Sequence, residues 1–152
     1  MLVSRPIVRN LILADDDEDD RSVFIDVIGE INSAIRVETV SDGLQLMKLL
    51  KDFAPDILFL DLDMPHKNGL ECIIEIRNNP ALKDLFTVVF SSTTRPANIQ
   101  TAYEMGAHLF LRKESSFTEY KSALKSILQF NWKEPQNIKQ QYCFNSNYVA
   151  FG

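Results

Sequence analysis

The sequence predicts an α/β fold, a doubly wound five-stranded parallel sheet with helices on both faces. Apolar runs of four to six residues alternate with longer segments of helical periodicity, which is the pattern of successive βαβ units. The run Ile57-Leu58-Phe59-Leu60 is apolar at every position, as expected of a central strand covered on both sides. The chain has 152 residues, which is close to the usual length of one domain.

The expected elements follow one another along the first 130 residues. Strands are expected at residues 8–14, 35–40, 56–60, 85–90 and 108–112. Each is followed by an expected helix, at residues 19–31, 43–53, 69–78, 96–105 and 116–130. Polar side chains in the second strand indicate an edge position. Asp42 and Ser115 are suitable helix caps, and Pro96 suits a first helical turn.

Composition and charge exclude several classes of function. Sixteen Lys and Arg residues against twenty-one Asp and Glu residues leave a net charge of −5. This balance disfavours direct binding to nucleic acid or to an anionic membrane surface. The two cysteines, Cys72 and Cys143, are too few for a disulfide-rich secreted scaffold and lack the spacing of zinc ligands. This cysteine usage favours a reducing cytosol, so we expect a cytoplasmic protein. No apolar run reaches the roughly 18 residues of a membrane span.

The composition changes after residue 130. The last 22 residues contain seven Asn or Gln residues and five of the 15 aromatic residues, namely Trp132, Tyr142, Phe144, Tyr148 and Phe151. A solvated tail seldom carries so many aromatic side chains, because their burial is what orders a chain. We therefore expect one domain over residues 1–130 and a tail over residues 131–152 that docks or forms a dimer, and that is not a separate domain.

Carboxylates follow two of the expected strands. Six acidic residues, 15–20, come directly after the first strand, and Asp61 and Asp63 come after the third. Ligands of open parallel sheets bind at the carboxyl ends of the strands, where these side chains would meet and repel one another unless a cation joins them. A solvated helix start accounts for residues 17–20 but not for Asp61. The oxygen ligands suit Mg²⁺.

A hydroxyl and an ammonium group are expected at the same edge. The fourth strand leads into Ser91, and the fifth ends next to Lys113. Taken singly, Ser91 is better explained as a turn hydroxyl and Lys113 as a surface lysine. Together with Mg²⁺ and a carboxylate acceptor, they would form a pocket suited to a phosphoryl group.

In these motifs the chain resembles the receiver domain of two-component response regulators, over about residues 5–130. The motifs are Ile12-Leu13-Ala14-Asp15-Asp16, Asp61-Leu62-Asp63-Met64-Pro65 with Gly69, then Ser91, and Phe110 through Lys113. Asp61 and Ser91 are 30 residues apart, and Ser91 and Lys113 are 22 apart, spacings that suit this family. The resemblance implies the flavodoxin-like strand order 2-1-3-4-5.

The resemblance also implies a magnesium site. Asp16 and Asp61 would bind Mg²⁺ directly, together with the backbone carbonyl of Asp63, and Asp15 would act through a water molecule. Asp61 would be the phosphoacceptor, receiving the phosphoryl group from a histidine kinase or a phosphotransfer protein.

The remaining roles concern the phosphoryl group and the switch. By the resemblance, Ser91 would bond a phosphoryl oxygen, Lys113 would pair with the group, and Phe110 would rotate inward following Ser91. The chain departs from the family at Glu114, where proline is usual, and at Ser91, where threonine is commoner. Both changes bear on the shape and stiffness of the switch.

These features predict a stand-alone response regulator that signals by protein–protein interaction. It would not be an enzyme beyond phosphotransfer and dephosphorylation at its own Asp61. We expect a possible homodimer through the face formed by residues 96–130 and the tail, and no nucleic-acid or membrane partner. One alternative is a receiver-fold binding module without phosphotransfer. The other is a phosphatase of the haloacid dehalogenase type, which shares the Asp61-Leu62-Asp63 pattern but normally has Thr or Val where this chain has Pro65.

Overall fold

Five parallel strands and one short antiparallel strand form a single sheet in the computed structural model, in the order β2-β1-β3-β4-β5-β6. The structure describes residues 7–92, 96–113, 116–129 and 148–150. The strands are β1 (Asn10–Ala14), β2 (Arg36–Val40), β3 (Ile57–Leu60), β4 (Phe86–Ser91), β5 (Leu109–Arg112) and β6 (Tyr148–Ala150). The five parallel strands confirm the predicted fold class and the order 2-1-3-4-5, with β2 at one edge.

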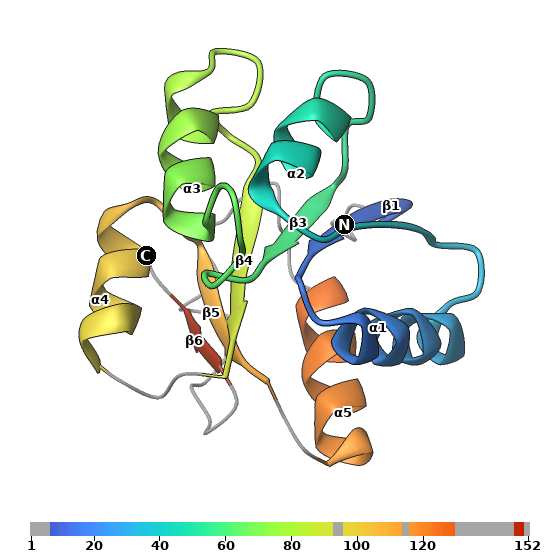
Figure 1. Cartoon of the computed structure of the whole chain (residues 1–152). Helices are drawn as coiled ribbons and strands as arrows, with labels where there is room; N and C mark the ends of the chain where they lie inside the picture. The colour runs from blue at the N-terminus through green and yellow to red at the C-terminus, as the bar shows by residue number, and fades with distance from the viewer. Residues whose placement is uncertain (1–6, 93–95, 114–115, 130–147, 151–152) are drawn as a thin grey trace, which may run out of the picture.

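Four helices connect the parallel strands, a fifth follows β5, and together they cover both faces of the sheet (Figure 1). They are α1 (Glu18–Ile31), α2 (Gly43–Leu49), α3 (Gly69–Asn78), α4 (Pro96–Glu104) and α5 (Phe117–Leu128). Helix α2 ends at Leu49 and not at the predicted residue 53, because the amides of Lys51 and Asp52 donate to carbonyls three residues back instead of four, which tightens the chain into turns. None of the described helices is long and apolar enough to cross a membrane.

Side-chain acceptors fix the starts of the helices. Asp42 caps α2 by accepting a hydrogen bond from the Gln45 amide, as predicted. Asn68 and Glu71 form a reciprocal capping box at α3. The cap of α5 is Ser116 and not the predicted Ser115, because the helix begins one residue later than expected.

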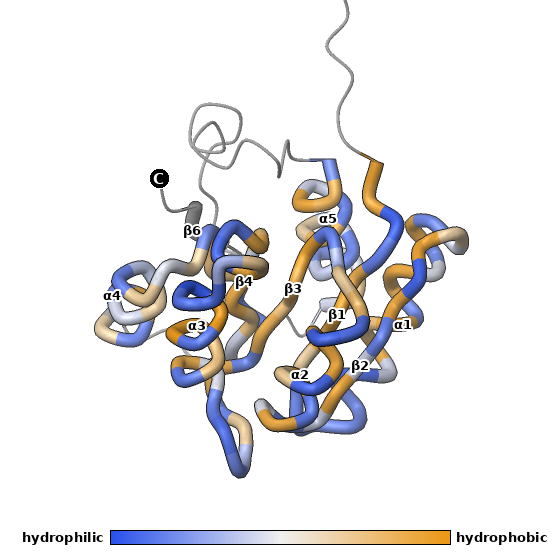
Figure 2. The backbone as a smooth tube through the Cα atoms, turned by 90° about the horizontal axis from the view of Figure 1, so that it is seen from above, coloured by the Kyte–Doolittle hydropathy of each residue, from blue (hydrophilic) through white to orange (hydrophobic). Residues whose placement is uncertain are grey.

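Alternate residues of each strand pack into two apolar layers. One layer joins α1 and α5 to one face of the sheet, with Phe24 and Leu124 packed near Phe59 of β3. The other joins α2, α3 and α4 to the opposite face, where Leu58 and Leu60 of β3 point. Figure 2 shows β1, β3 and β4 as apolar tubes between these helices. Since β3 is buried on both faces, its continuous apolar run follows directly from its central place.

The sixth strand was not predicted from the sequence. Residues 148–150 pair with β5 in antiparallel fashion, with Phe110 opposite Val149. Residues 130–147 and 151–152 lie outside the described part of the chain, including the predicted tail aromatics Trp132, Tyr142 and Phe144. The division into a domain and a docked or dimer-forming tail therefore stays a prediction.

Candidate functional site

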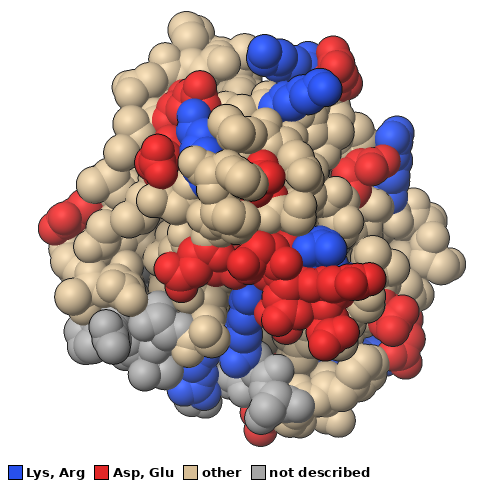
Figure 3. All heavy atoms as spheres, viewed as in Figure 1, with Lys and Arg blue, Asp and Glu red and all other residues tan. Residues whose placement is uncertain are grey.

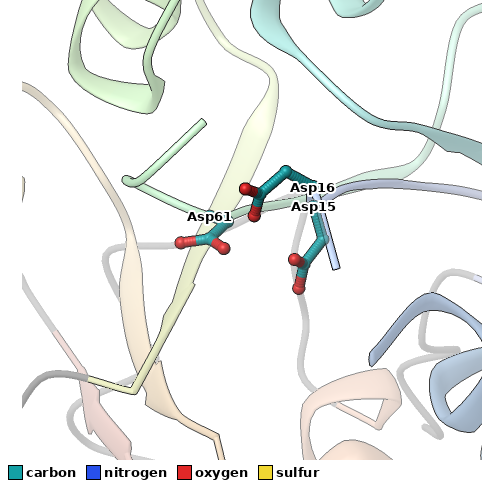
Figure 4. Close-up of side chains that lie close together, drawn as sticks. All are labelled: Asp15, Asp16 and Asp61. Atoms are coloured by element: carbon teal, nitrogen blue, oxygen red, sulfur yellow. The ribbon is translucent and has the colours of Figure 1, made fainter. Parts of the chain in front are cut away.

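Three carboxylates converge beyond the ends of β1 and β3 (Figure 4). One oxygen from each of Asp15, Asp16 and Asp61 lies within 4.8 Å of the others. Asp15 is fully buried and Asp61 is 4% exposed, whereas Asp16 is exposed. The structure thus brings together the three carboxylates that the sequence places at neighbouring strand ends.

The backbone holds two of these carboxylates in place. The Asp61 amide donates to the Ala14 carbonyl at 2.9 Å, which continues the β1–β3 pairing by one residue. Asp15 Oδ1 accepts a hydrogen bond from the Asp17 amide at 3.0 Å, and Asp61 Oδ1 accepts one from the Asp63 amide at 3.1 Å. Each side chain is therefore oriented by the amide two residues further on, an arrangement typical of aspartate at a turn.

Gly69 allows α3 to begin close to Asp61. A Cβ atom at position 69 would collide with the carbonyl oxygen of Asp61 and with Leu62. The Gly69 amide instead donates to the Leu62 carbonyl at 3.0 Å. A side chain here would push the start of α3 away from the carboxylate, which explains the glycine in the motif after Asp61.

Lys113 lies among the carboxylates. Its Nζ is 2.8 Å from Asp15 Oδ2 and 3.1 Å from Asp61 Oδ2. It also lies 2.8 Å from Asp20 Oδ2 on α1, a contact that the sequence did not predict. The Lys113 amide donates to the Ser91 carbonyl at 2.8 Å, so the end of β4 positions the backbone that carries the lysine.

Burial and charge shift the pKa values of both central groups. Burial raises the pKa of Asp61 to about 6, against the opposing effects of the Asp63 amide and the Lys113 charge. Burial alone would lower the pKa of Lys113. Its contacts with Asp15 and Asp20 and the charge of Asp61 outweigh that effect and raise the pKa above its usual value. Near neutral pH, Asp61 is mainly a carboxylate and Lys113 is an ammonium ion.

Two of the other predicted site residues line a cavity beside the carboxylates. The cavity has a volume of about 550 Å³, and Asp16, Asp63 and Ser91 are among the residues that line it. Ser91 is buried at the last position of β4, and Asp63 is exposed. Phe110 is not part of this lining; it is 2% exposed and packs in the apolar layer of α2, α3 and α4. The roles of Ser91, Phe110 and the Asp63 carbonyl stay predictions.

The donor set fits a magnesium ion. All three converging groups are carboxylates, and exposed Asp16 borders the cavity from which hydrated Mg²⁺ would enter. Figure 3 shows acidic side chains gathered across the centre of this face, with basic side chains beside them. Oxygen ligands, an excess of negative charge and an open side together meet the requirements of a cation that keeps some of its water.

Comparison with known proteins places this geometry in a family. The sequence matches the response regulator receiver domain over residues 11–125. Rcp1 of Synechocystis sp. is 25% identical over 131 residues, which cover 82% of this chain and 88% of Rcp1. The sensory transduction protein LytT of Oceanobacillus iheyensis is 29% identical over 118 residues, which cover 78% of this chain but 47% of LytT. The chain thus spans about half of LytT and most of Rcp1.

Solved structures show the same fold. The phosphorylated cyanobacterial phytochrome response regulator RcpA superposes with a TM-score of 0.73 at 25% identity, covering 79% of this chain and 91% of RcpA. The chemotaxis response regulator CheY4 of Vibrio cholerae has a TM-score of 0.70 at 20% identity, covering 79% of this chain and 98% of CheY4, and shows the fold alone. With the family match over residues 11–125, these findings show that the chain belongs to the response regulator receiver domain family.

Proposed function

We propose that the chain accepts a phosphoryl group on Asp61 from a histidine kinase or a phosphotransfer protein, with Mg²⁺ bound beside it. The observation that carries this proposal is the grouping of Asp15, Asp16 and Asp61 within 4.8 Å at strand ends, with Lys113 held against Asp61. The relative RcpA was crystallised in a phosphorylated form, which supports the same chemistry here.

The transfer needs a nucleophile, a charge to stabilise the phosphoryl oxygens and a leaving group. An oxygen of Asp61 forms a bond to phosphorus as the bond from phosphorus to the donor breaks, and the donor leaves with that electron pair. Bound Mg²⁺ would supply positive charge opposite the phosphoryl oxygens. Asp16 and Asp61, with the Asp63 carbonyl, would hold the ion, and Asp15 would hold one of its waters.

Ser91 and Lys113 complete the pocket from the neighbouring strands. Lys113 would pair with a phosphoryl oxygen, and the buried Ser91 hydroxyl would bond another. Because β4 continues into the face formed by α4, β5 and α5, a shift of Ser91 would be followed by Phe110 and would change that face. Phosphorylation would then alter a protein-binding surface of a cytoplasmic signalling protein.

The same face is the proposed homodimer contact. The backbone of β5 is already paired with β6 of the same chain. A dimer built by pairing the two β5 edges would therefore have to displace β6, whereas a dimer built from α4 and α5 would leave β6 in place. The proposal favours contacts through the helices.

The test is intact-mass spectrometry after incubation with acetyl phosphate and Mg²⁺. The wild-type chain should gain the mass of one phosphoryl group, and Asp61→Asn should gain none, because an amide cannot form the acyl phosphate. Asp19→Asn is the matched control, since it removes an exposed carboxylate from the start of α1 and should be labelled normally. Equal labelling of Asp61→Asn and the wild type would reject the assignment.

A magnesium titration of the same reaction separates the proposal from a binding module that has lost phosphotransfer. Labelling should require Mg²⁺ and should need much more of it in Asp16→Ala, which lacks one of the two direct carboxylate ligands. Labelling of Asp16→Ala at the wild-type rate in low Mg²⁺ would contradict the metal site. No labelling of the wild type at any concentration would favour the binding module.

A further inference from the structure

Lys113 is held by a carboxylate from outside the group assigned to the metal. Asp20 lies in the first turn of α1, and its Oδ2 is 2.8 Å from Lys113 Nζ, which is shorter than the 3.1 Å from Nζ to Asp61. The two residues are 93 positions apart in the chain. This ion pair therefore links the start of α1 to the residue that follows β5.

Three carboxylates surround the Lys113 ammonium group. Its Nζ donates hydrogen bonds to Asp20 at 2.8 Å and to Asp61 at 3.1 Å, and it lies 2.8 Å from Asp15 Oδ2 as an ion pair. A phosphoryl oxygen on Asp61 that binds Lys113 would therefore compete with these carboxylates for the same ammonium group.

Burial decides which contact is exchanged. The Asp15 side chain is fully buried, so loss of its cation would leave an unpaired charge away from water. Asp61 carries the phosphoryl group and stays next to the lysine. The Asp20 side chain is 39% exposed, so water can solvate its carboxylate when the lysine leaves.

We propose that Asp20 is a positioning residue that holds Lys113 before phosphorylation and competes with the phosphoryl group for it. This inference rests on the proposed function of Asp61. In the unphosphorylated protein, Asp20 keeps the ammonium ion in the pocket and neutralises part of its charge. Phosphorylation then requires Lys113 to exchange Asp20 for a phosphoryl oxygen, so Asp20 disfavours the phosphorylated state.

Asp20→Asn tests the competition. In saturating Mg²⁺ and a fixed, limiting concentration of acetyl phosphate, the steady-state ratio of phosphorylated to unphosphorylated protein should be roughly two- to fivefold higher than in the wild type, the size expected for a partly exposed ion pair. Asp20→Glu keeps the carboxylate and should behave like the wild type. Asp19→Asn removes the same charge from the same helical turn and should also leave this ratio unchanged.

A second measurement reports the contact itself without phosphorylation. The ammonium protons of Lys113, followed by NMR, should exchange with water faster in Asp20→Asn than in the wild type or Asp19→Asn, because the charged acceptor is replaced by a neutral amide that holds the ammonium group less tightly. An unchanged or lower phosphorylated-to-unphosphorylated ratio in Asp20→Asn would overturn the competition, and unchanged exchange would overturn the contact. If the wild type is not labelled at all, the proposed function fails and the role of Asp20 fails with it, while the exchange result still tests the contact.

Discussion

Two cations at opposite ends of the strands are held in different ways. Lys113, beyond the carboxyl end of β5, contacts the carboxylates of Asp15, Asp20 and Asp61. Arg77, near the C-terminus of α3, lies by the amino ends of β4 and β5 and donates instead to backbone carbonyls. It reaches the Gly106 carbonyl through Nε at 3.0 Å and through Nη2 at 2.7 Å.

The partners of Arg77 are neutral and fixed. Further hydrogen bonds go from Arg77 to the Leu85 carbonyl at 3.0 Å and to Thr87 Oγ1 at 3.1 Å. Gly106 has a positive φ of 101°, and a Cβ there would lie 2.9 Å from Arg77 Nε. Glycine thus allows both the turn and the close approach of the guanidinium group.

The difference shows what each end of the sheet can do. Backbone carbonyls and the Thr87 hydroxyl accept most of the hydrogen bonds of Arg77, so this region joins α3, β4 and the α4–β5 loop through neutral groups, with His108 as a titratable neighbour 3.5 Å away. The carboxylates around Lys113 outnumber it and repel one another, so that end gains from any further cation. The region around Arg77 links elements of the fold, which we call the structural link. The region around Lys113 has an excess of negative charge that a further cation would reduce.

The largest expected effect comes from removing Arg77, which makes the structural link. Arg77→Ala should lower the free energy of unfolding by about 4 kcal/mol, because it leaves partly buried carbonyls without their charged donor. Lys121→Ala, which removes a partly exposed lysine 3.7 Å from Glu30, should cost less than about 1 kcal/mol. Urea unfolding measures both variants, and similar losses would contradict the contrast between a cation with many backbone partners and one with a single ion pair.

His108 should make this region sensitive to acid. Burial, and then the charge of Arg77, lower its pKa to about 4, so the folded protein keeps the ring neutral where the unfolded chain protonates it. The free energy of unfolding should therefore fall by roughly 3 kcal/mol from this group as the pH drops from about 7 to 4. His108→Asn keeps an acceptor for the Thr87 amide and should lack this slope. Parallel pH profiles for the two proteins would reject the assignment.

Asp61, at the carboxyl ends of the strands, should have the opposite effect on the pH dependence of stability. Because its pKa is raised to about 6, the charged form destabilises the metal-free fold above that pH, and protonation relieves the cost as the pH falls toward 4. Asp61→Asn should be more stable than the wild type by about 3 kcal/mol at pH 7, with the gap closing by pH 4. Urea unfolding in EDTA provides the comparison. If the difference in stability between Asp61→Asn and the wild type widened as the pH fell, the fold would stabilise Asp61 as a carboxylate, which would contradict this prediction.

The smallest expected effect compares two buried hydroxyl groups. Tyr120 Oη has no hydrogen-bond partner among the described residues, while its ring stacks on Phe90 at 5.6 Å. Tyr120→Phe should leave stability unchanged or raise it by up to about 1 kcal/mol. Thr87→Val removes a hydroxyl bonded to the Leu85 carbonyl and should cost about 1–2 kcal/mol. Thermal unfolding of both variants tests whether only the hydrogen-bonded hydroxyl contributes to stability.

The site at the carboxyl end was predictable because its residues follow strand ends. Asp15, Asp16, Asp61 and Lys113 come together once the chain is divided into parallel β/α units. Asp20 was assigned to a solvated helix start, and its contact with Lys113 depends on how α1 lies against the sheet. In a run of six acidic residues, the sequence does not indicate which side chain faces Lys113.

The contacts of Arg77 could not be predicted from the sequence, and the reason differs from that for Asp20. Most partners of Arg77 are backbone carbonyls, which every residue carries and which therefore leave no mark in the sequence. His108 lies half-buried and stacks on Phe86 at 4.8 Å, a contact for which the sequence has no local signal. Strand β6 has three residues, too few for a period of apolar positions to identify it.

Mapping the phosphorylated residue tests the central claim most directly. Borohydride reduces an aspartyl phosphate to homoserine, so the wild-type chain is treated with acetyl phosphate and Mg²⁺, reduced, digested and sequenced by tandem mass spectrometry. The account predicts homoserine at position 61 alone. Homoserine at Asp16 or Asp63 instead, or unmodified aspartate at every position of a chain that gained no mass, would contradict it.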